Sequence, residues 1–280
     1  MTLLVPPSAP DAADGPAAKA ELLEETEDHE VPPTLSGEIL KPVLKIRPAI
    51  QKEFEYPLEK RYEIKLPVHE AFLHEVRAWL LLQPGGLREA YPPRRVNSVY
   101  LDTPELETYT DTRDGLLDRV KVRLRWYGPL EGMHAPTFEV KRKHNQLGWK
   151  LTQRLPFSFD LLRALWRDVV EAARCALHPD LRLWLDEGDR PVAITSYRRE
   201  YYATLDGAAR VTLDYDQQSY AQEFEAAPNV RYPSPSVGWM VVEVKAGAAQ
   251  RDLVRALAGA FPFRVWRNSK YVQAVDMAPY

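Results

Sequence analysis

Charged side chains recur at every second position in several segments of this 280-residue sequence, and they are its strongest chemical signal. Within 119–127 the alternate positions are Arg119, Lys121, Arg123 and Arg125, with apolar residues between them. Alternate side chains of a β-strand lie on one face, so four cations would share one face of that strand. Neighbouring like charges repel each other, and this row therefore indicates an anionic ligand opposite it.

The same alternation occurs in four other segments, where isolated carboxylates accompany the bases. The positions on the charged faces are Glu59, Arg61, Glu63 and Lys65; Glu139, Lys141 and Lys143; Arg210, Thr212, Asp214 and Asp216; and Glu243 and Lys245. Many cations with a few carboxylates suit a polyphosphate site, because cations neutralise phosphate oxygens and carboxylates hold a divalent cation. Alternation alone leaves open whether this face meets bulk solvent, as an ordinary sheet face does, or lines the inside of a barrel.

Other catalytic constellations are absent from the sequence. It contains no glycine-rich phosphate-binding loop, no dinucleotide fingerprint and no nucleophile elbow. The six histidines show no metal-ligand spacing; His69 and His74, for example, are five positions apart rather than the four of a zinc helix. The single Cys175 excludes an internal disulfide framework and a cysteine-rich zinc site.

The elements that must position these charges are mostly strands. Period-two alternation predicts strands at 59–66, 95–102, 119–127, 136–143, 149–155, 192–205, 209–216 and 239–246. Helical spacing predicts helices at 68–79, 160–177 and 248–261, with a short helical turn near 269–275. We therefore predict an α+β fold built on an antiparallel eight-stranded β-barrel, with helices packed on the outside.

Composition divides the chain into a tail and one domain. The first 53 residues contain no aromatic residue, and the first 50 hold eight of the 24 prolines. Such a segment buries too little to offset its ordering entropy, so we predict that residues 1–50 are a disordered Pro/Ala/Glu-rich acidic tail and that 54–280 form one folded domain. A docking or regulatory role for the tail stays open.

Charge and hydropathy narrow the class of protein further. Residues 1–40 have a net charge of −8 and the rest of the chain +5, and the total of −3 argues against a polybasic nucleic-acid-binding protein. No apolar run approaches the roughly 18 residues of a membrane-spanning helix, and the first residues lack the basic and apolar regions of a secretory signal. We therefore expect a cytoplasmic protein with no membrane segment in this chain and no nucleic-acid partner.

Several of these motifs together resemble one family. The run Arg123-Leu124-Arg125-Trp126-Tyr127-Gly128 resembles the R-x-R-x-Y-G strand of the VTC domain, the polyphosphate polymerase module of the vacuolar transporter chaperone complex. Seven further elements follow in the family's order: Arg61-x-Glu63-x-Lys65, Ser98-Val99-Tyr100-Leu101-Asp102-Thr103, Phe138-Glu139-Val140-Lys141, Tyr197-Arg198-Arg199, Arg210-Val211-Thr212-Leu213-Asp214, Val242-Glu243-Val244-Lys245 and Ser269-Lys270-Tyr271. The resemblance covers nearly all of the predicted domain.

This resemblance implies a triphosphate tunnel metalloenzyme, an antiparallel barrel with a basic and hydrated interior. It implies an enzyme, an ATP-dependent polyphosphate polymerase that transfers the γ-phosphate of ATP to a growing inorganic polyphosphate chain with Mn²⁺ or Mg²⁺. Two alternatives stay open: a metal-dependent tunnel triphosphatase, and a non-catalytic polyphosphate-binding module. The implied ligands are ATP and inorganic polyphosphate, and a separate membrane partner could couple synthesis to translocation.

The resemblance also implies roles for individual residues. The catalytic phosphate clamps would be Arg123, Arg125, Lys141, Arg199, Arg210 and Lys270. Further phosphate-binding cations would be Lys65, Lys121, Lys143, Lys150, Arg154 and Lys245, and the metal ligands would be Glu243, Glu63 and Glu139. Arg61 departs from the tunnel triphosphatases, which carry a glutamate at its position; this exchange of a metal ligand for a cation favours the polymerase over simple hydrolysis.

Overall fold

The computed structural model describes residues 44–46, 61–83, 86–145, 147–264 and 266–279, all within the unit Leu40–Tyr280. Of the predicted tail, only Leu44–Ile46 (β1) are described, and they pair antiparallel with Phe157–Asp160 (β8). These three residues therefore form regular structure inside the segment predicted to be disordered. The rest of residues 1–50, and the predicted boundary at Phe54, lie outside the described residues.

Eight strands form a closed antiparallel ring, which confirms the predicted α+β class and all eight predicted strands. In order around the ring they are β10 (Ala209–Ala221), β11 (Trp239–Gly247), β2 (Arg61–His69), β7 (Leu147–Arg154), β6 (Thr137–His144), β4 (Asp118–Tyr127), β3 (Arg88–Asp102) and β9 (Arg190–Ala203). A small second sheet joins β1, β8 and β5 (Met133–His134). Closure gives each strand of the ring a neighbour on both sides, so strands surround the interior.

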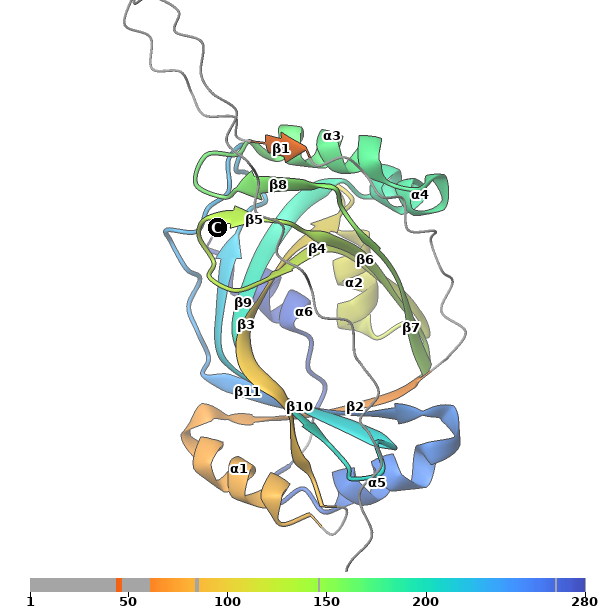
Figure 1. The fold of residues 1–280 in the computed structure, drawn as a ribbon. Helices are drawn as coiled ribbons and strands as arrows, with labels where there is room; N and C mark the ends of the chain where they lie inside the picture. Colours follow the sequence, from red (N-terminus) through yellow and green to blue (C-terminus); the bar gives the residue numbers. More distant parts are fainter. Residues whose placement is uncertain (1–43, 47–60, 84–85, 146, 265, 280) are drawn as a thin grey trace, which may run out of the picture. The chain divides into compact units, whose positions relative to one another are not determined.

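Helices cover the outer side of the ring in two groups (Figure 1). Helices α1 (Leu73–Leu81) and α5 (Arg251–Gly259) lie on one side, and α3 (Trp166–Ala176) and α4 (Pro179–Glu187) lie on the other. The strand residues that pack with α1 and α5 include Leu66, Leu213 and Val242, and those that pack with α3 and α4 include Leu124 and Val140. The apolar alternate positions therefore face outward, under the helices.

Shorter helices complete the fold. They are η1 (Glu70–Phe72), α2 (Glu107–Asp114), η2 (Ala248–Gln250) and α6 (Lys270–Asp276). The predicted helix at 68–79 starts too early, because Pro67 and Val68 still pair with β11. Among the described residues, β2 pairs with β7 only through Arg61 and Tyr62, so the rest of β2 has one edge without a strand partner there, and a proline is tolerated at such an edge.

Two helices were not predicted, and their burial explains why. Helix α2 contains no buried residue, so it has no apolar stripe to detect. Helix α4 buries only Leu181 and Leu185, a signal too short to distinguish from a loop with occasional apolar residues. Its start is nevertheless well defined, because Pro179 occupies the first turn and His178 accepts a hydrogen bond from a backbone N–H.

Helix α6 is anchored to the end of β3 through one buried carboxylate. Asp102 accepts hydrogen bonds from the backbone N–H groups of Thr108 and Tyr109, each at 2.9 Å, and from the hydroxyl of Tyr271. Tyr271 also stacks on Tyr100, with ring centroids 4.7 Å apart. This anchor holds the start of α6, and with it Lys270, against the interior of the ring.

Candidate functional site

The charged alternate positions lie on the interior face of the ring. Lys141 on β6 contacts the carboxylate of Glu63 on β2 at 2.8 Å, although β7 lies between these strands. Arg199 on β9 lies 3.5 Å from Glu243 on β11, across β10. Side chains two strands apart converge in this way only on the concave face of a curved sheet. The structure thereby decides between a solvent-facing sheet and an enclosed charged face.

We call the charged residues on this face the interior cluster, and within it cations outnumber carboxylates. Its cations are Lys65, Lys121, Arg123, Arg125, Lys141, Lys143, Lys150, Arg199, Lys245 and Lys270, and its carboxylates are Glu63, Glu139, Asp214 and Glu243. Ten cations therefore face four carboxylates. The surplus positive charge is what an anionic ligand would neutralise.

The first carboxylate, Glu139, is held by three cations from β4 and β7. Its oxygens lie 2.8 Å from Nε of Arg123, 3.6 Å from Arg125 and 3.1 Å from Lys150. Burial alone would raise the pKa of Glu139, but Arg123 and Arg125 lower it well below its usual range. Glu139 is therefore ionised, and its oxygens serve to orient guanidinium groups.

The second carboxylate, Asp214, joins β9, β10 and α6. It is fully buried, 2.5 Å from Arg199 and 2.6 Å from Lys270. Burial would raise the pKa of Asp214, and Arg199 and Lys270 lower it below its usual value. We did not predict a site role for Asp214, although the Arg210-to-Asp214 motif contains it.

Tyr197 is a second interior residue absent from the predicted set. Its hydroxyl accepts a hydrogen bond from Arg125 at 3.3 Å, and the Lys270 ammonium lies 4.7 Å from the centre of its ring. The Arg199 guanidinium lies 5.3 Å from the same ring centre. A buried ring that faces three cations helps to hold them close together without neutralising them. Tyr197 lies two residues before Arg199 on one strand, so alternation alone could have placed it on the same face as Arg199.

The remaining two carboxylates, Glu63 and Glu243, lie on the neighbouring strands β2 and β11. Lys65 bridges them, 3.3 Å from Glu243 and 3.9 Å from Glu63, and Lys245 lies 2.6 Å from Glu243. Burial raises the pKa of each carboxyl group, and the surrounding lysines lower both below the usual range. Glu63 and Glu243 are thus ionised and adjacent, whereas Glu139 belongs to the separate arginine group.

Lys121 and Lys141 show that the interior has too few carboxylates. Lys121 donates a hydrogen bond to the Ser269 hydroxyl at 2.7 Å and has no ion pair in the described part of the chain. Burial and the nearby Lys65 and Lys141 lower the pKa of Lys121 well below its ordinary value. Burial also lowers the pKa of Lys141, to about 8, although Glu63 opposes this change.

Two predicted site residues stand apart from this network. Arg210, next to the start of β10, and Arg154, at the end of β7, are both exposed, and neither makes an ion pair with any residue that the structure describes. Asp216 also leaves the charged face, because a register shift between Tyr215 and Gln218 interrupts the alternation of β10. It pairs with Arg95 instead.

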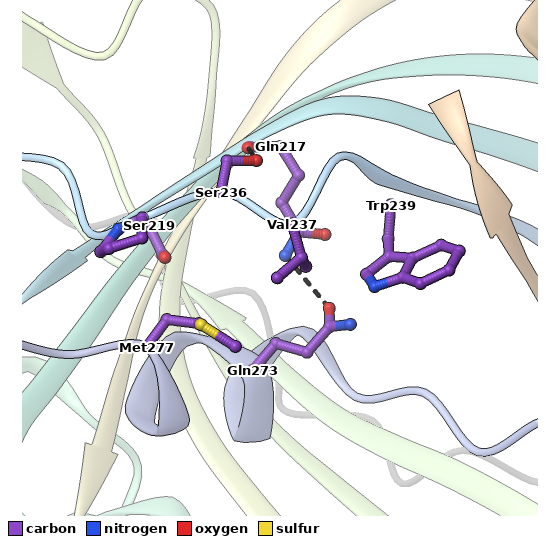
Figure 2. Close-up of a pocket in the computed structure, with 8 residues that line it drawn as sticks. Gln217, Ser219, Ser236, Val237, Trp239, Gln273 and Met277 are labelled. Atoms are coloured by element: carbon purple, nitrogen blue, oxygen red, sulfur yellow. Dashed lines mark hydrogen bonds between the residues drawn. The ribbon is translucent and has the colours of Figure 1, made fainter. Parts of the chain in front are cut away.

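A small pocket lies beside α6 (Figure 2). Its lining comes from β10, β11, α6 and the segment before β11: Gln217, Ser219, Pro235, Ser236, Val237, Trp239, Gln273 and Met277. Gln217 donates a hydrogen bond to Gln273 across it at 3.4 Å. The pocket has room for about one water molecule and no charged lining residue, so it is not the phosphate site.

Fold and site together define a class: a closed antiparallel ring whose interior, in place of an apolar core, holds a surplus of lysine and arginine. A family model for the VTC domain matches residues 60–278, so the chain belongs to the VTC domain family. The family named from the sequence motifs is thereby confirmed. A search of curated proteins gives no match to this chain.

Two solved structures are similar to this chain at low identity. The PH1819 protein from Pyrococcus horikoshii is 13% identical, with a TM-score of 0.41, and the match covers 76% of this chain and 95% of that one. A "putative adenylate cyclase" from Vibrio parahaemolyticus is 15% identical, with a TM-score of 0.41, and the match covers 76% and 98%. Neither likeness bears on the activity of this chain.

The structure also bears on the expected absence of a membrane segment. Among the described residues, no helix has both the length and the hydropathy to cross a bilayer. The cytoplasmic location stays a prediction.

Proposed function

We propose that this protein is a polyphosphate polymerase that transfers the γ-phosphate of ATP to a growing polyphosphate chain held by the interior cluster. Membership of the VTC domain family supports a polyphosphate-related substrate. The observation that carries the proposal is the surplus of interior cations, seen most clearly at Lys121. Its ammonium group is half-buried among other cations and has no ion-paired carboxylate in the described ranges, and a bound phosphate would supply the missing charge.

Phosphoryl transfer from one phosphate to another requires few chemical groups from the protein. The attacking oxygen of a polyphosphate end is already ionised, so no side chain has to serve as nucleophile or general base. The main obstacle is repulsion between two anions, about 4 kcal/mol for unit charges about 4 Å apart at an effective dielectric constant near 20. Cations fixed before the substrate arrives reduce this repulsion without reorganising during the reaction.

Ion pairs within the interior cluster keep the cations in place for this task. Arg123 and Arg125 are oriented by Glu139, and Arg199 and Lys270 by Asp214. Each carboxylate contacts at least two cations, so the cations stay partly uncompensated and can also bind phosphate oxygens. We assign Glu139 and Asp214 this positioning role, and we propose Arg123, Arg125, Lys141, Arg199 and Lys270 as the groups that clamp the phosphates.

The donor set fits a divalent cation in part. No group of three His, Cys, Asp or Glu residues that could hold a metal occurs among the described residues. Glu63 and Glu243 still offer adjacent ionised oxygens, and Mg²⁺ is often held by one or two carboxylates together with substrate phosphates and water. We propose Glu63 and Glu243 as the residues that would hold Mn²⁺ or Mg²⁺, which would polarise phosphoryl oxygens. Glu139 lies with Arg123, Arg125 and Lys150, apart from this adjacent pair, and is not proposed as a ligand.

Incubation of the full chain with ATP and Mn²⁺, followed by resolution of the products, tests the proposal. Long phosphate chains together with ADP support a polymerase. Free phosphate without chains would instead indicate a triphosphatase, and tight binding of polyphosphate without turnover would indicate a binding module. The Arg125→Ala variant is the control for the site, because any product made by the interior cluster should decrease with it.

A further inference from the structure

A group of aromatic rings with one guanidinium lies near the start of β3, outside the ion pairs described above. We call Tyr91, Arg94, Tyr127 and Tyr201 the rim cluster. Arg94 stands directly opposite Arg199 in the register of β3 and β9, and Tyr91 stands opposite Tyr201. Residues directly opposite in a sheet share a face. The rim cluster therefore lies on the same face as the interior cluster.

The rings of the rim cluster are held in place yet exposed. The Arg94 guanidinium lies 4.1 Å from the centre of the Tyr127 ring and 5.0 Å from that of Tyr201, and its Nε donates to the Tyr201 hydroxyl at 2.9 Å. Tyr91 meets Tyr201 edge to face, with centroids 5.9 Å apart. Tyr91 is nevertheless 61% exposed and Tyr127 47% exposed. Ordered rings that are partly exposed, as Tyr91 and Tyr127 are, are suited to stacking against a planar ligand.

The backbone of β3 is irregular at this point. The register between β3 and β9 shifts on both sides of Tyr91, between Glu89 and Tyr91 and again between Tyr91 and Arg94. Pro92 and Pro93, which cannot donate backbone hydrogen bonds, lie within the second shift. Bulges re-aim side chains and are frequent at the rims of barrels and beside active sites. At this site the bulges interrupt the regular pairing of β3 with β9, and the ring of Tyr91 is exposed to solvent.

The rim cluster and α6 lie at opposite ends of β3. Asp102, the last residue of β3, binds Tyr271 of α6, whereas Tyr91 is close to the first residue. Along β9 the interior positions run Tyr201, Arg199, Tyr197 from the rim inward, and a strand rise of about 3.3 Å per residue separates Tyr201 from Tyr197 by about 13 Å. A nucleoside triphosphate that lies along this strand face would therefore bring its phosphates to Arg199 and Tyr197 when its base lies at the rim.

We propose that the rim cluster is a stacking platform for the base of a purine nucleoside triphosphate whose phosphates occupy the interior cluster; this inference rests on the proposed function. Stacking on tyrosine reads the π-face of a base and not its hydrogen-bonding edge. The platform therefore accepts ATP and GTP alike, and it favours both over UTP, whose single ring offers less area. The base adds affinity that inorganic tripolyphosphate lacks.

Calorimetric titration of the full chain with ATP, GTP, UTP and tripolyphosphate tests this inference. Because Tyr91→Ala removes a ring on which the base stacks, it should weaken ATP binding about tenfold. Tripolyphosphate affinity should not change, because the phosphate contacts are intact. Tyr91→Phe keeps the ring and should retain ATP affinity. Tyr232→Ala, which removes a 72% exposed tyrosine between β10 and β11, is the matched control.

The outcomes separate this inference from the proposed function. Equal weakening of ATP and tripolyphosphate by Tyr91→Ala, or no weakening of either, overturns the platform while leaving the interior site in place. A wild-type chain that does not bind tripolyphosphate refutes the interior site and the platform together. Tyr127→Ala provides a second variant should Tyr91→Ala fail to fold, as judged by circular dichroism, and the same selective loss of ATP binding is expected.

Discussion

Replacing Asp214 by asparagine would remove the carboxylate that lies between two buried cations, Arg199 and Lys270. The side chain of Asp214 is fully buried and that of Lys270 is 6% exposed, so solvent cannot take over its role. Removing one partner of a buried ion pair costs about 3–5 kcal/mol. At about 2–4 °C of melting temperature per kcal/mol for a domain of this size, we expect Asp214→Asn to lower Tm by roughly 10 °C.

Tripolyphosphate should restore much of this loss. A ligand that binds only the folded state stabilises it in proportion to the logarithm of its concentration over Kd. The variant has one more uncompensated interior cation than the wild type, so it should bind the anion more tightly and its Tm should rise further on addition of tripolyphosphate. Differential scanning calorimetry with and without the ligand measures both changes.

Asp186→Asn is the matched control for this experiment. Asp186 lies 2.9 Å from Arg174 on the protein surface, and its side chain is 46% exposed. An exposed pair contributes about 0–1 kcal/mol, so Tm should barely change and the response to tripolyphosphate should equal that of the wild type. Our reasoning would fail if Asp214→Asn had the same Tm as the wild type, or if tripolyphosphate raised its Tm by no more than it raises that of the wild type. Either result would show that the interior cations do not form an anion site.

Three further predictions follow from the interior cluster. Arg125→Ala should reduce polyphosphate synthesis by about 10²–10³ with an unchanged circular dichroism spectrum; full activity would show that this guanidinium does not touch substrate. Glu243→Gln should abolish synthesis and the response to Mn²⁺ titration, and an unaltered response would assign the metal elsewhere. Because burial lowers the pKa of Lys141 to about 8, its ammonium loses the proton as pH rises through that value. Tripolyphosphate affinity should therefore fall above pH 8, and Lys141→Arg, which stays charged, should remove that fall.

The regular elements were predictable wherever local spacing reflects burial. The alternation of 119–127, for example, gave β4 nearly to its ends, because Val122 and Leu124 pack outward beneath helices. Helix α2 escaped prediction because it buries nothing, and the start of α1 was placed too early because β2 continues through Pro67. At the start of α1 a long-range strand pairing decided the structure, whereas α2 lacks the apolar pattern that a prediction needs.

The candidate site was predictable as a set of residue types but not as a set of partners. Spacing places Glu63, Glu139 and Glu243 on charged strand faces without saying which of them meet. In the structure Glu63 and Glu243 are neighbours, whereas Glu139 belongs to Arg123 and Arg125. Which cations each carboxylate contacts depends on the order of strands around the ring. That order cannot be inferred from the residue pattern of any single segment.

The amino-acid sequence by itself determined which side chains share a strand face, that lysine and arginine predominate on those faces, and to which family the motifs point. Only the tertiary structure decided that the charged faces turn inward, that Arg154 and Arg210 stay outside the network, and that Tyr91 and Arg94 continue the same face to the rim. The physical reason is how far apart in the chain the residues lie that determine each property. Side-chain alternation is a property of a few consecutive residues, whereas closure of the ring and its register depend on hydrogen bonds between strands far apart in the chain.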